Sequence, residues 1–170
     1  EEWEAETYPV DRPEGDALAR YGAGLLPIDY KPADATSPIF NYPYARTRDA
    51  LERMSRAGAP DPHFGYKLRY INPATGDWAM PTIATTMQWL PGGFATRPYQ
   101  ATDGLGFVCV EGAGETRVTL PDGAVQVLKW SPRDVFVVPG WLKHTHHPAG
   151  DAVLFGFSDR SAQEKLGLFR

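Results

Sequence analysis

Cysteine is nearly absent from this chain of 170 residues, and Cys109 stands alone, so an intrachain disulfide is excluded. A single thiol fits a reducing compartment, and we expect a cytoplasmic protein. No apolar run approaches the ~20 residues of a membrane-spanning helix, and the first residues show no signal-peptide pattern. A basic excess is also missing, since the net charge is -4 and the pI is near 5.5. Nothing in the charge therefore indicates a nucleic-acid surface.

Two familiar catalytic patterns are missing as well. The chain has no Gly-x-Ser-x-Gly motif, which excludes the nucleophile elbow of many hydrolases. Gly112-Ala-Gly114 is not followed by Lys-Ser or Lys-Thr, so it indicates a turn rather than a phosphate-binding loop.

Glycine and proline are abundant instead, with 17 and 16 residues. This abundance of turn-forming residues favours many short strands joined by tight turns over long helices. Hydrophobic residues make up 42% and charged residues 22%, which is typical of one soluble globular domain with a sizeable core.

Strand patterns begin after residue 82. Six segments have the alternation or the apolar composition of β-strands, namely 83–90, 105–111, 116–120, 125–129, 134–138 and 152–157. Pro121-Asp-Gly123 predicts a hairpin turn between two of them. Cys109 lies in the uniformly apolar run Phe107-Val-Cys-Val110, which predicts a central strand with a buried thiol. This spacing of short strands favours an all-β sandwich or barrel.

The segments outside the strands predict little regular structure. Residues 1–45 indicate an extended arm with room for one short strand, 47–57 a short helix, and 61–67 a loop. Tyr70-Ile-Asn-Pro-Ala-Thr-Gly76 predicts a turn, because Asn-Pro starts one and Gly76 allows positive φ. Ser161-Ala-Gln-Glu164 has the pattern of a capping box that opens a terminal helix through Leu168.

Three of the four histidines lie in Pro139-Gly-Trp-Leu-Lys-His144-Thr-His-His147. Histidine is a common metal ligand and acid or base. If a strand continues here, His144 and His146 share one face and His147 points the other way. Two interpretations stay open: a small-molecule or two-histidine metal pocket that includes Tyr99 and Trp141, or hydrogen-bonding histidines, exposed or partly buried, at a barrel mouth.

Several segments together resemble the carboxyl-terminal cupin of the gentisate 1,2-dioxygenase family. They are Tyr70 to Gly76, Val110-Glu-Gly-Ala-Gly114, Asp134-Val-Phe-Val-Val-Pro-Gly-Trp141, Leu154-Phe-Gly-Phe-Ser-Asp159 and Leu166-Gly-Leu-Phe-Arg170, with Ser37-Pro38 and residues 42–51 similar to the preceding segment. The resemblance implies a cupin jelly-roll barrel, or double-stranded β-helix, at residues 70–170. Residues 1–69 would then form an arm and one short helix packed on that barrel, and a short helix would end the chain.

The resemblance also implies where a metal belongs. Enzymes of this family are described as two-cupin chains that hold Fe(II) with three histidines of the amino-terminal cupin and use O2 to cleave a hydroxylated aromatic acid. The general cupin metal pattern places its first ligands on Tyr99, Ala101 and Leu105, and its last on His144, with Trp141 replacing a glycine. Only His144 is retained, so we expect no metal, no cofactor and no catalytic residue in this chain.

Three functions remain open from the sequence. The chain is either the metal-free carboxyl-terminal part of a gentisate 1,2-dioxygenase-like enzyme of aromatic compound catabolism, or a stand-alone cupin that binds a small molecule or supports oligomerisation. The start at Glu1 rather than Met favours a fragment. In the first case its partners would be the amino-terminal cupin half, the aromatic acid, O2 and further copies in a homo-oligomer. The third possibility is turnover by this chain itself through His144 and His146.

Overall fold

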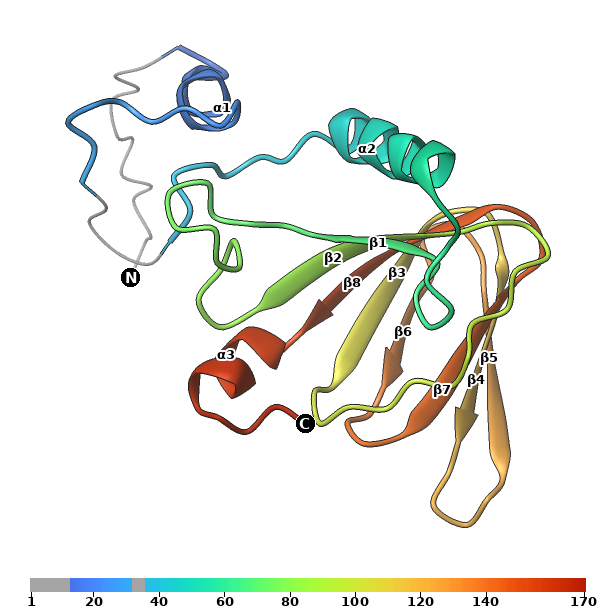
Figure 1. The fold of residues 1–170 in the computed structure, drawn as a ribbon. Coiled ribbons are helices and arrows are strands. Elements are labelled where there is room, and N and C mark those ends of the chain that lie inside the picture. The colour runs from blue at the N-terminus through green and yellow to red at the C-terminus, as the bar shows by residue number, and fades with distance from the viewer. Residues whose placement is uncertain (1–12, 32–35) are drawn as a thin grey trace, which may run out of the picture.

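The computed structural model describes residues 13–31 and 36–170, in which two β-sheets face each other and helices lie along one side (Figure 1). The part of the expected arm at residues 1–12 and 32–35 lies outside this description. The helices are α1 (Asp16–Tyr21), α2 (Tyr44–Ala57) and α3 (Arg160–Lys165). The strands are β1 (Tyr66–Arg69), β2 (Ala84–Leu90), β3 (Leu105–Glu111), β4 (Gly114–Thr119), β5 (Val125–Trp130), β6 (Val135–Val138), β7 (Lys143–Pro148) and β8 (Ala152–Ser158).

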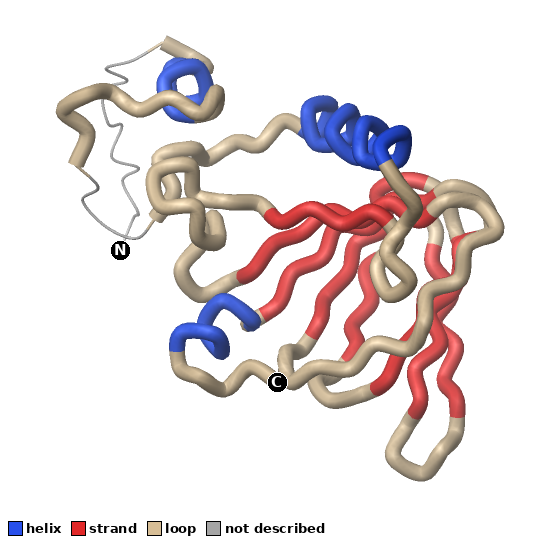
Figure 2. The backbone as a smooth tube through the Cα atoms, viewed as in Figure 1, coloured by secondary structure: helices blue, strands red, loops and turns tan. Residues whose placement is uncertain are grey.

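The larger sheet has the strand order β1-β2-β8-β3-β6, and the smaller has the order β5-β4-β7 (Figure 2). All of their strand pairs are antiparallel. Among the described residues, no ladder joins one sheet to the other, so they form a sandwich and do not close into the continuous barrel that we expected. A turn separates edge strands β5 and β6, in which Arg133 has a φ of 78° and Ser131 binds the Asp134 carboxylate.

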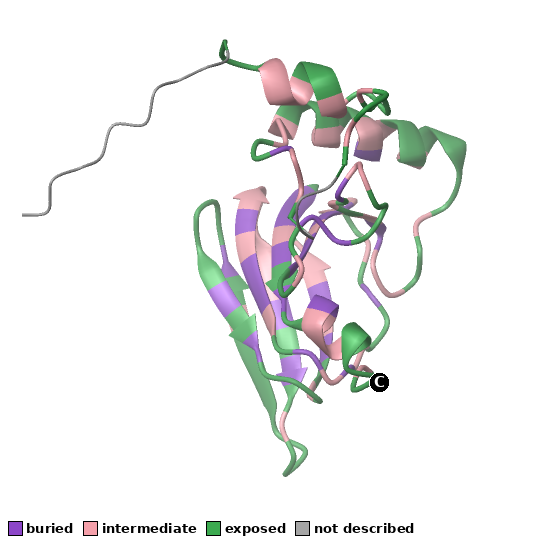
Figure 3. Cartoon of the chain, turned by 90° about the vertical axis from the view of Figure 1, so that its left-hand side faces the viewer, coloured by how far each residue is buried: buried purple, intermediate pink, exposed green. Residues whose placement is uncertain are grey.

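Apolar side chains form two cores, one on each face of the larger sheet. The space between the sheets is filled by residues such as Leu90, Phe107, Trp130, Val138 and Leu154. On the outer face, α2 covers the sheet and buries Leu51 completely. Figure 3 shows buried residues concentrated on the strands, while the hairpin tip between β4 and β5 is exposed. The interior between the sheets is therefore closed to bulk solvent along much of its length.

Six strands confirm the sequence prediction, each to within two residues at either end. The β4–β5 hairpin is also confirmed, with Gly123 at a φ of 86°. Cys109 is a buried free thiol, as expected. Two strands were not predicted outright. β1 falls partly in the expected loop 61–67, and β7 was left conditional because its inward positions carry histidines rather than apolar residues.

The helices differ more from the expectation. α1 is a second helix ahead of the sheets, in a segment predicted to be extended, and its Asp16–Arg20 pair at 3.0 Å spans one turn. α2 begins three residues earlier than predicted, directly after Pro43. The capping box is wrong, because Asp159 precedes α3 while the Ser161 hydroxyl donates to carbonyl oxygens of Met80 and Pro81. α3 also ends at Lys165, before Leu168.

None of the described helices is both long and apolar enough to cross a membrane. The division of the chain into residues 1–69 and 70–170 stays a prediction.

Candidate functional site

The strand β7 carries His144 and His146 into the space between the two sheets. Alternation along the strand leaves these two side chains only 5% and 2% exposed, whereas His147 is half-buried on the other face and bonds to Thr145. The two imidazole centroids lie 5.2 Å apart. The interpretation of these groups as exposed or partly buried histidines is therefore wrong, since both belong to the interior.

A short chain of hydrogen bonds fixes the ring of His146. The Trp130 indole donates to the Thr116 hydroxyl oxygen over 3.0 Å, and that oxygen lies 2.8 Å from Nδ1 of His146. The Phe107 ring contacts the other side of the imidazole, with centroids 5.0 Å apart. Thr116 is fully buried, so its bonds compete with no bulk water. The Nδ1 atom is thereby occupied, so any metal or ligand at this ring would have to bind Nε2.

His144 is held by the segment that carries Tyr99. The backbones of Tyr99 and His144 exchange two hydrogen bonds of 3.0 Å each, and their rings meet edge to face with centroids 5.8 Å apart. The Thr96 N–H donates to the His146 carbonyl, and the His146 N–H donates to the Thr96 hydroxyl oxygen, so residues 96–99 run alongside β7. Nδ1 of His144 is buried and has no well-aligned hydrogen-bond partner among the described residues, although an interaction with the Leu142 backbone acts to raise the pKa of this ring.

Burial keeps both interior imidazoles neutral. It lowers the pKa of His144 to about 4, and the nearby Lys67 ammonium acts in the same direction. The pKa of His146 lies well below its ordinary value, again because of burial and then because of His144 and Lys67. Near pH 7 these side chains are hydrogen-bonding groups or potential metal ligands, and they carry no charge.

Trp141 does not join this cluster. The residue is 57% exposed, and its backbone has a φ of 67°. Its N–H donates to the Ala101 carbonyl, and its own carbonyl accepts from the Gln100 amide. Of the four predicted pocket residues, the structure thus brings together Tyr99, His144 and His146 and leaves Trp141 outside.

These donors do not fit an Fe(II) centre. At the other two ligand positions of the cupin pattern stand a buried alanine, Ala101, and a partly buried leucine, Leu105, neither of which has a donor atom. Across residues 13–31 and 36–170, no group of three His, Cys, Asp or Glu side chains could hold a metal ion. Two imidazoles alone leave too few ligands for the three-histidine arrangement.

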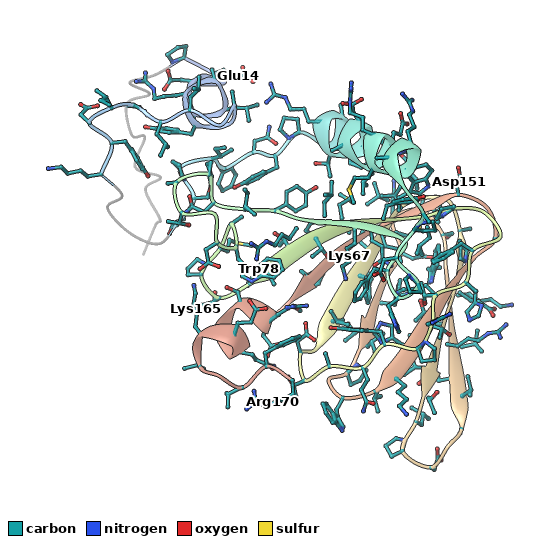
Figure 4. All side chains as sticks on the ribbon, in the orientation of Figure 1. Glu14, Lys67, Trp78, Asp151, Lys165 and Arg170 are labelled. Carbon is teal, nitrogen blue, oxygen red and sulfur yellow. The ribbon has the colours of Figure 1, made fainter. Side chains whose placement is uncertain are left out.

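Sequence reasoning missed the charged residues that face the same interior. Lys67 on β1 and Asp103 in the segment before β3 line a small cavity together with Tyr99, Thr86 and Arg160. Figure 4 places the labelled Lys67 over the larger sheet, between α2 and α3. Lys67 was not predicted as a site residue, because the sequence indicated a loop at residues 61–67. The available signal was the alternation of Tyr66-Lys-Leu-Arg69, in which Tyr66 and Leu68 pack toward α2 and Lys67 faces inward.

A larger hollow lies on the opposite face of the sheet, away from the histidines. It has a volume of about 410 Å³ and is lined by residues of α1, α2 and β1, among them Leu18, Tyr42, Arg46 and Leu68. Its walls are mostly apolar, so it is a groove beneath the arm that is separate from the histidine cluster.

The chain is similar in sequence to enzymes that cleave aromatic acids, although no protein-family model matches it. It is 50% identical over 161 residues to gentisate 1,2-dioxygenase 1 of Aquipseudomonas alcaligenes, covering 95% of this chain and 45% of that protein. It is 30% identical to the 5-aminosalicylate 1,2-dioxygenase of a Comamonas species, covering 93% and 42%. The salicylate 1,2-dioxygenase structure from Pseudaminobacter salicylatoxidans superposes with a TM-score of 0.81 at 28% identity, covering 91% of this chain and 45% of that one.

The chain therefore spans about half the length of the relatives that it matches. Its homology to one half of the gentisate 1,2-dioxygenases confirms the resemblance found in the sequence. The structural match confirms the mostly-β cupin fold class, with the two sheets left unclosed.

Proposed function

We propose that this homologue of one half of the gentisate 1,2-dioxygenases is the carboxyl-terminal, metal-free cupin of an enzyme that cleaves a hydroxylated aromatic acid with O2. Fe(II) would sit in the amino-terminal cupin of that enzyme, together with the substrate. The observation that carries this proposal is the match of nearly the whole chain to less than half of its relatives, combined with a donor set that does not fit Fe(II).

In this proposal, the chain supplies packing and subunit contacts rather than catalytic groups. Support comes from apolar side chains that the described chain leaves exposed in two regions. On the arm, Leu25, Ile28 and Phe40 are 66%, 106% and 103% exposed, and on β6 Val135 and Val137 are 63% and 59% exposed. We expect the amino-terminal half and further copies in a homo-oligomer to cover such surfaces. The buried free thiol of Cys109 supports a cytoplasmic setting.

The test compares this chain alone with the whole protein, using gentisate as the probe substrate. We expect no oxygen uptake by the chain supplied with Fe(II), and uptake by the protein that contains both cupins. In that protein, His144→Ala should leave a measurable kcat, because the proposal puts the substrate in the other cupin. Uptake by the isolated chain that is lost in His144→Ala would overturn the proposal and favour turnover through His144 and His146.

The second candidate is a stand-alone cupin that binds a small molecule or acts as a structural module. The polar groups buried between the sheets favour it, because an inert core would not need them. The length of the encoded product separates the two candidates. A reading frame of about twice this length supports the dioxygenase half, and one that starts where this chain starts supports the stand-alone protein.

A further inference from the structure

Unpaired polar atoms gather between the two sheets. Gln88, Asp103 and His144 are 2%, 3% and 5% exposed, and each has one buried side-chain atom without a hydrogen-bond partner: Nε2, Oδ1 and Nδ1. Each such atom costs roughly 1–3 kcal/mol if nothing binds to it. The Lys67 ammonium adds three hydrogen-bond donors. Its nitrogen lies over the face of the Phe64 ring, 4.8 Å from the ring centroid.

Strand register places two of these groups next to each other. Lys67 on β1 is paired with Gln88 on β2, so their side chains stand side by side on the inner face of the sheet. Lys67 and Asp103 line one cavity with Tyr99. The ring of Tyr99 also contacts the ring of His144 edge to face. The cavity has a volume of about 40 Å³. At roughly 10–15 Å³ for each water, it has room for about three or four non-hydrogen atoms.

We propose that this cavity binds a small oxyanion that carries one hydroxyl group, of the size and chemistry of bicarbonate, between Lys67 and Asp103. The ionised oxygens accept hydrogen bonds from the Lys67 ammonium, which lines the cavity together with Asp103. The hydroxyl group donates to Oδ1 of Asp103, which an oxyanion without a hydroxyl cannot do. One ligand therefore satisfies donors and an acceptor that the protein leaves unpaired.

The electrostatics of the cavity agree with an anion at this place. Burial lowers the pKa of Lys67 to about 8, and Arg160 adds to this, while Asp103 opposes it only in part. Arg160 already has an acceptor, Glu164, at 2.7 Å, so Lys67 is the lining cation that lacks one. His144 and His146 are neutral and add no competing charge near pH 7. A bound anion would raise the pKa of Lys67 and cause proton uptake above pH 8.

The test is thermal unfolding of the unmodified chain in sodium bicarbonate, sodium formate and sodium chloride at one pH and one ionic strength. We expect bicarbonate to raise Tm by roughly 2–4 °C over chloride at about five times its Kd. Formate lacks the hydroxyl group and should raise Tm less. Equal Tm values in bicarbonate and chloride would overturn the proposal and leave a cavity that holds ordered water only.

The matched variants are Lys67→Met and Lys129→Met. Lys129 is an exposed residue on the edge strand β5, so its replacement should keep the full bicarbonate effect. Lys67→Met should abolish that effect, and an unchanged effect would refute the site. If Lys67→Met does not fold, exchange of ¹³C-labelled bicarbonate with the unmodified chain decides by NMR, and the absence of a bound signal counts against the proposal. Neither readout depends on ring cleavage, so this site and the proposed function can fail separately.

Discussion

Tyr99 and His144 are joined twice: their backbones exchange two hydrogen bonds of 3.0 Å, and their rings meet edge to face at 5.8 Å. In the cupin metal pattern, these are the positions of two ligands. The side chains at these two positions are therefore neighbours, although one of them is a tyrosine. His146 is a further neighbour of His144, with the two imidazole centroids 5.2 Å apart.

The cluster of Tyr99, His144 and His146 predicts that one substitution creates a metal site. Tyr99→His would place a third imidazole beside two that are already neutral, and Thr116 already orients one of them in the manner of an outer-shell partner. We expect Zn²⁺ binding by calorimetry with one site per chain, against none in the unmodified chain. Tyr99→Phe is the control. Failure of the histidine variant to bind Zn²⁺ would mean that the three side chains are not arranged as a ligand set.

Stability should fall in mild acid because of the buried imidazoles. The pKa of His144 is about 4 in the folded chain and 6.5 in the unfolded chain, so the unfolded chain binds the proton more readily between these values. The stability that comes from keeping His144 neutral is fully present above pH 6.5. It is lost as the pH falls toward 4, which lowers the free energy of unfolding by about 3 kcal/mol. Urea unfolding at several pH values measures this loss. His144→Gln should flatten the dependence, and an identical pH profile would contradict the assignment.

The contribution of the Thr116 hydrogen bonds to stability can be measured separately from the packing of its side chain. Thr116→Val keeps the shape of the side chain but removes the acceptor for the Trp130 indole and the partner of His146. We expect a loss of roughly 1–3 kcal/mol in the free energy of unfolding. Thr119→Val, on the exposed end of the same strand, is the matched control and should change little. Equal effects of the two substitutions would argue against the network.

Two glycines with positive φ should respond differently to alanine. Gly112 has a φ of 76°, and a Cβ atom there would overlap the Asp151 carbonyl and crowd Ala152. Gly123 has a φ of 86° with open space around it. We expect Gly123→Ala to cost about 1 kcal/mol of strain, and Gly112→Ala clearly more, because the neighbouring backbone has to move. Chemical denaturation of both variants measures the difference, which would vanish if β8 could shift freely.

Residues close in sequence allowed much of the fold and part of the site to be predicted. The six apolar strands have local alternation, and the Pro-x-x-x-x-His spacing located His144. The strand β7 was harder, because Lys143-His-Thr-His-His-Pro148 buries histidines where apolar residues are the usual signal. The pairing of Lys67 with Gln88 could not be inferred from sequence, since it depends on the register of β1 and β2. The cavity that Lys67 shares with Asp103 depends on the path of the loop before β3.

We propose that this chain does not hold catalytic iron, and its iron content decides the question. The purified chain is incubated with Fe(II) without oxygen, freed of excess metal and measured by elemental analysis beside His144→Ala. We expect both proteins to carry the same background level of iron, because the chain offers two interior imidazoles and no third ligand among its described residues. One iron per chain, lost in His144→Ala, would contradict it.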